Sequence, residues 1–141
     1  MISEARTYLK SRIATVASSY RQIDDPIGDD DLSRLDIENG FRIIFGNNAI
    51  SYDGNTYEDE VAVAIELFKK AGLTQVVESF DSLYDTALNV RDAVTNPTTV
   101  KENANFNDIL AQGFTIESIQ TNDKTFKVTL NFNLKRSFTY Q

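Results

Sequence analysis

The stretch from residue 126 to residue 135 alternates apolar and polar side chains without a break. Its apolar members are Phe126, Val128, Leu130, Phe132 and Leu134, and its polar members are Lys127, Thr129, Asn131, Asn133 and Lys135. Successive side chains of a β-strand point to opposite faces, so this period of two predicts a strand with one buried face and one solvated face. Any fold for this chain must therefore contain a sheet that is covered on one side.

A second pair of alternating stretches lies earlier in the chain and predicts a β-hairpin. Residues 41–46 and residues 60–68 each place their large apolar side chains on one face. The dipeptide Asp53-Gly54 lies between them and is a strong signal for a two-residue hairpin turn, because such turns need positive φ angles. Since the flanking residues also favour strands, we expect the hairpin to extend into a protruding tip.

The stretch 126–135 belongs to a closing hairpin. Residues 114–121 and 125–134 are predicted as its two strands, and Asn122-Asp123-Lys124 is predicted as the turn between them. Phe138 and Tyr140 continue the alternation towards the end of the chain, where we expect them within reach of a neighbouring molecule.

Two segments carry the period of an amphipathic helix. In residues 3–21 the apolar side chains recur at spacings of three and four, and Ser3 can cap the start. The remaining arc of this helix holds Arg6, Lys10, Arg12 and Arg21, which predicts a basic outer face. Residues 73–95 show a broader apolar stripe, with Thr74 as the cap and Asn96-Pro97 as the stop. Both helices are expected to cover the sheet.

Two polar segments connect these elements. Residues 22–39 contain Pro26 and clustered aspartates, which disfavour regular structure, and in residues 96–112 a short helical turn is expected at 106–112. The order helix, hairpin, helix, hairpin predicts an α+β domain in which an antiparallel sheet from two hairpins packs against two helices. With 141 residues and no low-complexity linker, the chain is predicted to be a single domain, 1–141.

The formal charge of −7 is unevenly distributed. Residues 1–23 carry a net charge of +3, residues 24–60 carry −9 and residues 61–141 carry −1. The acidic segment is interpreted as a solvated face or loop; the alternative is an electrostatic contact with a basic surface, such as the first helix of a neighbouring copy. The overall acidity disfavours nucleic-acid binding, because the phosphate backbone repels it.

The residue types exclude several kinds of site. The chain has no cysteine and no histidine, so disulfides, thiol catalysis, zinc–thiolate sites and Ser–His or Cys–His pairs are impossible. None of the six glycines belongs to a Gly-x-Gly-x-x-Gly or phosphate-loop pattern. Asp53-x-Asn55 begins like a calcium loop but lacks the later ligand and glycine. We therefore expect no enzyme activity, no cofactor and no metal, with a cation at the aspartates 29–31 as the weaker alternative.

Signals for membranes or export are also missing from the pattern. No stretch approaches the roughly 20 apolar residues of a membrane-spanning helix. The first residues, Met1-Ile2-Ser3-Glu4, lack the basic start and apolar run of a signal peptide. A reducing, cytoplasmic compartment without membrane contact is therefore expected.

The order of these elements resembles the tail-terminator (tail-completion) proteins of long-tailed bacteriophages. The resemblance rests on the amphipathic first helix, the acidic connector with Pro26, the strand pair 40–46 and 60–69 with its long hairpin, the helix 74–95, and the closing pair 114–121 and 125–134 with its tyrosine-bearing tail. It covers nearly the whole chain and is carried by element order, length and hairpin character rather than by a short motif.

The resemblance implies a structural role in the virion. Proteins of this family form a hexameric ring on the head-proximal end of the tail tube, stop polymerisation of the tail tube protein and join the tail to the head-connector or stopper protein. DNA passes only transiently through the lumen, and assembly takes place in the host cytoplasm.

Such a ring joins one patch of each copy to a different patch of the next, for which the basic first helix and the acidic segment 24–60 are complementary. The candidate interface residues are Arg6, Arg12, Arg21, Asp29, Asp30, Asp31, Tyr52, Asp53, Tyr57, Phe138 and Tyr140.

Three other functions stay open on the residues alone. They are another neck or connector protein of a phage, a monomeric module that adds a peptide strand to a sheet edge, and a small enzyme that uses Asp or Glu as acid and base. A perturbed carboxylate at the base of a deep apolar pocket favours the enzyme, whereas monomeric behaviour at high concentration favours the binding module.

Overall fold

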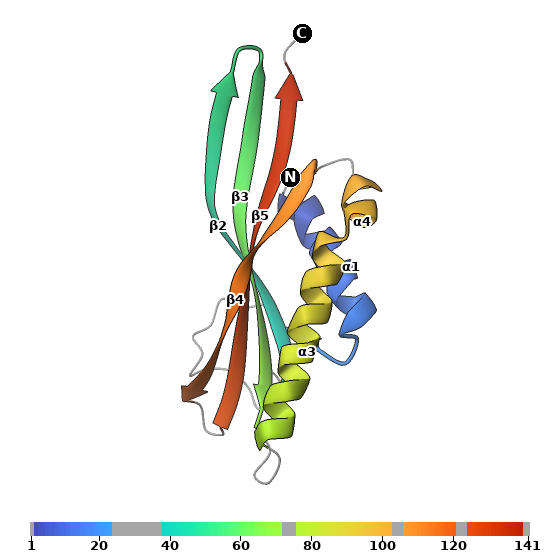
Figure 1. Ribbon diagram of the computed structural model, residues 1–141, viewed down its shortest axis with the longest axis vertical. Helices are drawn as coiled ribbons and strands as arrows, with labels where there is room; N and C mark the ends of the chain where they lie inside the picture. Colours follow the sequence, from blue (N-terminus) through green and yellow to red (C-terminus); the bar gives the residue numbers. More distant parts are fainter. Residues whose placement is uncertain (1, 24–37, 72–75, 103–105, 121–123, 140–141) are drawn as a thin grey trace.

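A computed structural model describes residues 2–23, 38–71, 76–102, 106–120 and 124–139. Its elements in chain order are α1 (Ile2–Val16), β1 (Arg21–Gln22), β2 (Asn39–Asp53), β3 (Thr56–Lys70), α3 (Val76–Thr95), α4 (Pro97–Glu102), β4 (Asp108–Gln120) and β5 (Lys124–Thr139). The five strands form one sheet in the order β1-β2-β3-β5-β4, and α1 and α3 lie side by side against one face of it (Figure 1). The predicted α+β class is therefore confirmed.

The sheet is mixed rather than antiparallel, because β1 runs parallel to β2 with Arg21 opposite Gly40. The helix predicted over 3–21 ends at Val16, so the placement of Arg21 on that helix is wrong. Ser18 and Ser19 follow, and serine favours turns because its hydroxyl competes for backbone hydrogen bonds. The turn is closed by the amide of Tyr20, which donates to the carbonyl of Ala17 at 3.0 Å.

The short helix is also displaced from its predicted position. Residues 106–112 do not form a helical turn, since β4 already begins at Asp108, and the short helix is α4. Asn96 and Pro97 explain the difference. The side chain of Asn96 accepts a hydrogen bond from the amide of Thr98 at 3.0 Å, and Pro97 occupies the first helical position. The same two residues that end α3 therefore also begin a new helix.

The core lies between the sheet and the two long helices. Eight buried side chains of β3 and β5 form paired rows on this face: Val61 with Leu134, Val63 with Phe132, Ile65 with Leu130 and Leu67 with Val128. The helices add Leu9, Ile13, Leu83, Ala87, Val90 and Val94 to the same cluster. The buried face predicted from the alternation in 126–135 is thus confirmed, as is the role of both helices as its cover.

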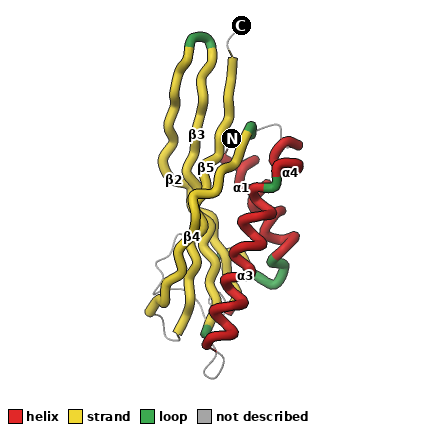
Figure 2. Tube along the Cα trace, viewed as in Figure 1, coloured by secondary structure: helices red, strands yellow, loops and turns green. Residues whose placement is uncertain are grey.

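Beyond the helices, strands β2, β3 and β5 continue as a slender extension, which we call the arm (residues 48–60 and 135–139). Figures 1 and 2 show that, among the described elements, no helix lies against the arm. The hairpin predicted at Asp53-Gly54 is confirmed, but its two loop residues are Gly54 and Asn55. Gly54 has a φ of 62°, and no other residue type in the described chain has a positive φ, which fits a type II′ turn with glycine in the first loop position.

Candidate functional site

The tip of the arm brings four of the predicted interface residues together. Tyr52 is opposite Tyr57 in the pairing of β2 with β3, and Tyr57 is opposite Phe138 in the pairing of β3 with β5. The rings of Tyr52 and Tyr57 are 6.1 Å apart, and Tyr52 is 72% exposed. Asp53 is also exposed and leads into the turn. Tyr57 is half-buried, so Tyr52 is the exposed ring of the pair. An exposed tyrosine on a projecting hairpin is typical of a protein contact, because tyrosine combines a large apolar ring with a polar end.

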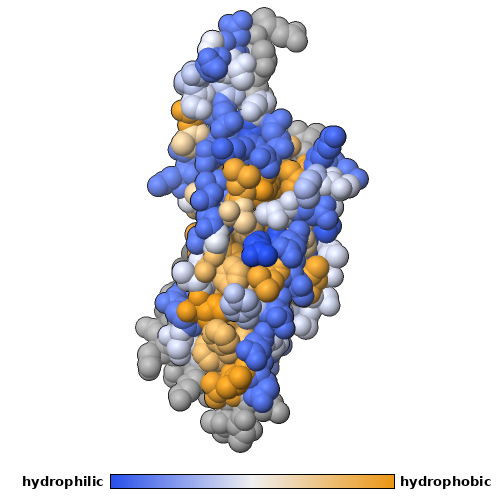
Figure 3. All heavy atoms as spheres, in the orientation of Figure 1, coloured by the Kyte–Doolittle hydropathy of each residue, from blue (hydrophilic) through white to orange (hydrophobic). Residues whose placement is uncertain are grey.

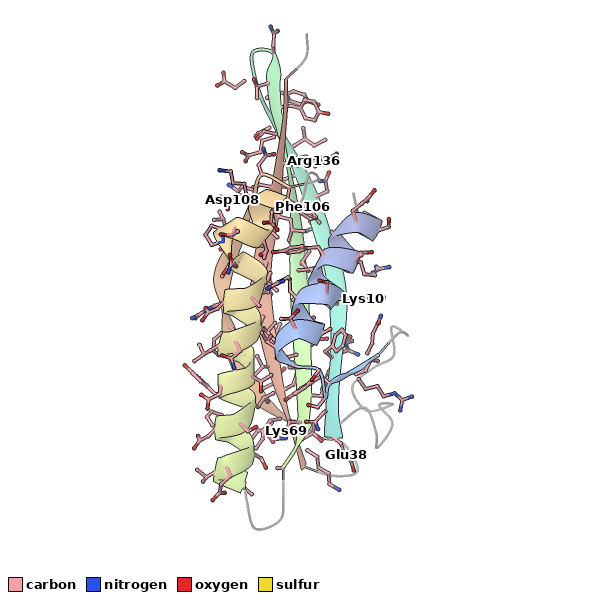
Figure 4. All side chains as sticks on the ribbon, turned by 90° about the vertical axis from the view of Figure 1, so that its right-hand side faces the viewer. Lys10, Glu38, Lys69, Phe106, Asp108 and Arg136 are labelled. Carbon is pink, nitrogen blue, oxygen red and sulfur yellow. The ribbon has the colours of Figure 1, made fainter. Side chains whose placement is uncertain are left out.

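Three acidic residues of the arm are paired within the chain. Lys135 Nζ lies 3.6 Å from a carboxylate oxygen of Glu58 and 3.9 Å from one of Glu60. Arg136, which is labelled in Figure 4, lies 3.7 Å from a carboxylate oxygen of Asp59. Pairs of this exposure contribute at most about 1 kcal/mol each, so they order the arm more than they stabilise the domain. They also show that part of the acidic segment 24–60 is balanced by β5.

The three arginines predicted as one basic patch are separated. The guanidinium of Arg6 lies 5.2 Å from the ring centroid of Phe45 on β2. Arg12 turns towards the other helix and donates to the carbonyl of Ala93 at 3.2 Å, and Arg21 belongs to β1. The last carbonyls of a helix need donors, which explains the orientation of Arg12. The prediction that a single outer face holds all three arginines is therefore wrong.

Five of the predicted interface residues have no described side chain. Asp29, Asp30, Asp31 and Tyr140 lie outside the described residues, as do the acidic connector around Pro26 and the cap predicted at Thr74. For Phe138 only the backbone pairing is described. The predicted contact between the basic helix and the acidic connector stays a prediction.

A network of charges crosses four strands on the face opposite the helices. Glu66 is bonded through one carboxylate oxygen to the guanidinium of Arg42 and through the other to Lys127 Nζ, at 3.1 Å. Lys127 also lies 3.3 Å from a carboxylate oxygen of Glu117 on β4. The Arg42 guanidinium covers the buried ring of Phe68 at 5.2 Å. This network was not predicted from the sequence, although Glu66, a single acid between Ile65 and Leu67 in an apolar run, was a visible signal for it.

Glu66 is the one buried carboxylate in the described part of the chain, with 6% of its surface exposed. A carboxylate that acts as acid or base must exchange a proton with a substrate, whereas both oxygens of Glu66 are held by cationic side chains of neighbouring strands. The arrangement therefore ties β2, β3 and β5 together. Over the same residues, no group of three or more carboxylates is placed to hold a metal ion.

A second unusual group is Tyr20, whose hydroxyl is buried without a hydrogen-bond partner among the described residues. The nearby Thr86 hydroxyl bonds to the carbonyl of Ser82 instead, at 2.9 Å. Burial raises the pKa of Tyr20 above its usual value of 10.0, and Thr86 offsets only part of this increase. The folded chain thus holds the phenol proton more tightly than the unfolded chain does.

We expect Tyr20→Phe to stabilise the fold by about 1 kcal/mol, because it removes a buried hydroxyl that has lost its water. The wild-type stability should be complete below pH 10 and should decline as the pH rises from there towards the higher pKa of the folded state. Urea unfolding of both proteins from neutral to alkaline pH measures the difference, which should widen above pH 10. A constant difference across that range would contradict the assignment.

Apolar side chains also gather outside the core, along the seam between α3 and β4 (Figure 3). Phe80 packs edge-on against Phe126 at 5.7 Å, and Tyr84 packs against Phe114 at 5.2 Å. Although they contact the sheet, Phe80 and Tyr84 keep more than a third of their surfaces exposed. The aromatic side chains along this seam therefore extend the core but remain partly exposed to solvent.

The described helices include none that is both long and apolar enough to cross a bilayer. No protein-family model matches the chain, and no curated protein matches it either.

Proposed function

We propose that this chain is a structural protein of a long-tailed bacteriophage that caps the head-proximal end of the tail tube as a hexameric ring. In this role it ends polymerisation of the tail tube protein and joins the tail to the head connector. The proposal combines the order of the elements with the arm, which is the observation that carries it.

The arm is built as a docking element. Its strands extend beyond α1 and α3, so the residues of the arm bury little apolar surface within their own molecule. At the same time it exposes Ile50 and Tyr52, which are residue types that anchor protein interfaces. An ordered extension that contributes little to its own core and presents such side chains is best explained by a partner that covers it.

The partner proposed for the arm tip is the tail tube protein. The tip projects along the strand direction, away from the helices and from the outer sides of the sheet. A ring of such subunits can therefore contact its own copies sideways and a different protein lengthwise. The net charge of −7 is compatible with a lumen through which DNA passes without adhering.

A tube-length assay tests the proposal. The tail tube protein of the phage that encodes the chain is polymerised with and without the purified chain, and tube lengths are measured by electron microscopy. We expect the chain to shorten the tubes and to occupy one end of each tube. Tyr52→Ser should weaken this effect at least tenfold in the concentration required, whereas Tyr84→Ser, a half-exposed tyrosine on α3, should not.

Unchanged tube lengths at saturating wild-type chain would overturn the proposal. If the chain instead bound the head connector and left tube growth unaffected, the role of another neck protein would take its place.

A further inference from the structure

The outer strands β2 and β4 each have a long stretch without charge, whereas most charges of the sheet lie on the inner strands. Residues 43–52 of β2 and residues 109–116 of β4 contain no charged side chain. The inner strands β3 and β5 carry Glu58, Asp59, Glu60, Glu66, Lys69, Lys70, Lys124, Lys127, Lys135 and Arg136. This distribution is the reverse of the one that protects a sheet, because edge strands usually carry charges that prevent pairing with other molecules.

Over this length no described residue pairs with the outer side of either edge. In the described part of the chain, β1 pairs with β2 only at Gly40 and Phe41, and β4 pairs on one side only, with β5. Within the described ranges, the outer backbone amides and carbonyls of these stretches have no ladder partner, and such groups can pair with a further strand. The exposed side chains beside them include Ile44, at 44%, and Leu110, at 39%.

The two edges match in level along the sheet. Across the sheet, Ala49 of β2 is opposite Glu60, Glu60 is opposite Lys135, and Lys135 is opposite Asp108 of β4. Ala49 and Asp108 therefore lie at the same height along the strands. Ile43 and Phe114 are joined in the same way through Ile65 and Leu130. Each edge also has a bulge between these levels, at 45–48 in β2 and at 111–113 in β4. Bulges can protect an edge, but these two lie at neighbouring levels, on either side of the pair Val63 and Phe132, so the edges bend close to each other in height.

We infer that the β2 edge of one copy pairs with the β4 edge of a second copy of this chain. From β2 to β4 each neighbouring pair of strands is antiparallel, so β4 runs opposite to β2 and the next copy continues the antiparallel order. Ile44 is opposite Ala64 and Leu110 is opposite Asn133, so both side chains lie on the sheet face that points away from α1 and α3 and meet on one side of the new junction.

This contact joins two different surfaces, so it can repeat from copy to copy and close into a ring. The inference rests on one element of the proposed function, namely that copies of this chain associate into a ring. It would also direct the arm of every copy to the same side of the ring, because all copies share the strand direction.

Two edge variants test the inference. Ile44→Lys places a charge on the β2 edge and Leu110→Lys places one on the β4 edge, while Val77→Lys, at 68% exposure on α3, is the matched control. Sedimentation velocity over a range of concentrations gives the assembly state, and circular dichroism confirms folding. Where either edge variant fails to fold, Ala49→Lys or Thr115→Lys, both at exposed positions, replaces it.

We expect the wild type and Val77→Lys to assemble with concentration and each edge variant to stay monomeric. An equimolar mixture of the two edge variants should reach twice the monomer mass and no more, because it retains one intact β4 edge and one intact β2 edge. As the chain has no cysteine, Ala49→Cys and Asp108→Cys should also cross-link through a short bis-maleimide when mixed.

A wild type that is monomeric at every concentration overturns the inference, and so does assembly of both edge variants like the wild type. Loss of assembly in only one variant would indicate contact between identical edges and would also overturn it. None of these results decides the tube-length assay, which measures capping on a tube, so a failure of the edge pairing and a failure of the proposed function are distinguishable.

Discussion

Replacement of Glu66 by glutamine is expected to lower the free energy of unfolding by about 3–5 kcal/mol, because it removes the buried carboxylate that the largely buried Arg42 and Lys127 share, and the contact that Lys127 keeps with Glu117 is to an exposed side chain. Glu66 is 6% exposed, and its carboxylate is shared by Arg42 and Lys127. Marginal stability makes this a large change, since domains of this size unfold with about 5–15 kcal/mol. The face opposite α1 and α3 would lose the side-chain contact that joins β2 and β5 through β3.

Urea unfolding at neutral pH measures this change, and Glu117→Gln is its control. Glu117 contacts the same Lys127, but its side chain is 57% exposed, so its replacement should cost less than about 1 kcal/mol. The triple variant Arg42→Leu, Glu66→Leu and Lys127→Met should recover most of the stability. It removes all three charges, and with them the free-energy cost of keeping them away from water. A loss within 1 kcal/mol for Glu66→Gln would show that water reaches the network.

Replacement of Phe132 by alanine is expected to cost about 3–5 kcal/mol, through lost burial and the cavity that remains. Phe132 is 1% exposed and lies opposite Val63, between the sheet and its helical cover. The matched change Tyr52→Ala removes an aromatic ring of similar size from the exposed arm and should alter stability by no more than about 0.5 kcal/mol. Thermal and urea unfolding of both variants compare the two sites directly, and equal losses would contradict the division into core and arm.

The features that were predictable from sequence are those fixed by local pattern. The alternation in 126–135 determines which side chains of β5 face the core, since a strand with five large apolar residues on one face can bury only that face. The hairpin at Asp53-Gly54 was predictable because few sequences meet the φ requirement of its turn. The stop of α3 at Asn96-Pro97 follows from the missing amide of proline in the same way.

The features that were not predictable depend on contacts between distant segments. β1 is two residues long and exists only because Arg21 and Gln22 pair with β2, so no local period marks it. The network around Glu66 depends on the register that places Arg42 opposite Glu66 and Lys127 within reach, and single strands do not fix register. The sequence pattern places Arg12 on the outer face of its helix, whereas in the structure Arg12 donates a hydrogen bond to the carbonyl of Ala93 near the end of α3.

The candidate site shows the same division. Tyr52, Asp53 and Tyr57 could be grouped in advance because one hairpin turn brings them together. The uncharged stretches of β2 and β4 could not be recognised in advance as sheet edges, because the position of a strand in the sheet depends on how all the strands pair. The absence of charge in 43–52 and 109–116 indicates a contact surface only after the strand order has placed these stretches on the outer strands β2 and β4.

The position of this chain in the virion tests the proposed role most directly. Tails purified from the phage that encodes the chain can be labelled with gold through an added tag and viewed by electron microscopy, with the copy number taken from quantitative mass spectrometry. The account predicts label only at the head-proximal end, in the copy number of one hexameric ring per tail. Label along the tube, label at the distal tip, or a virion without the chain would contradict it.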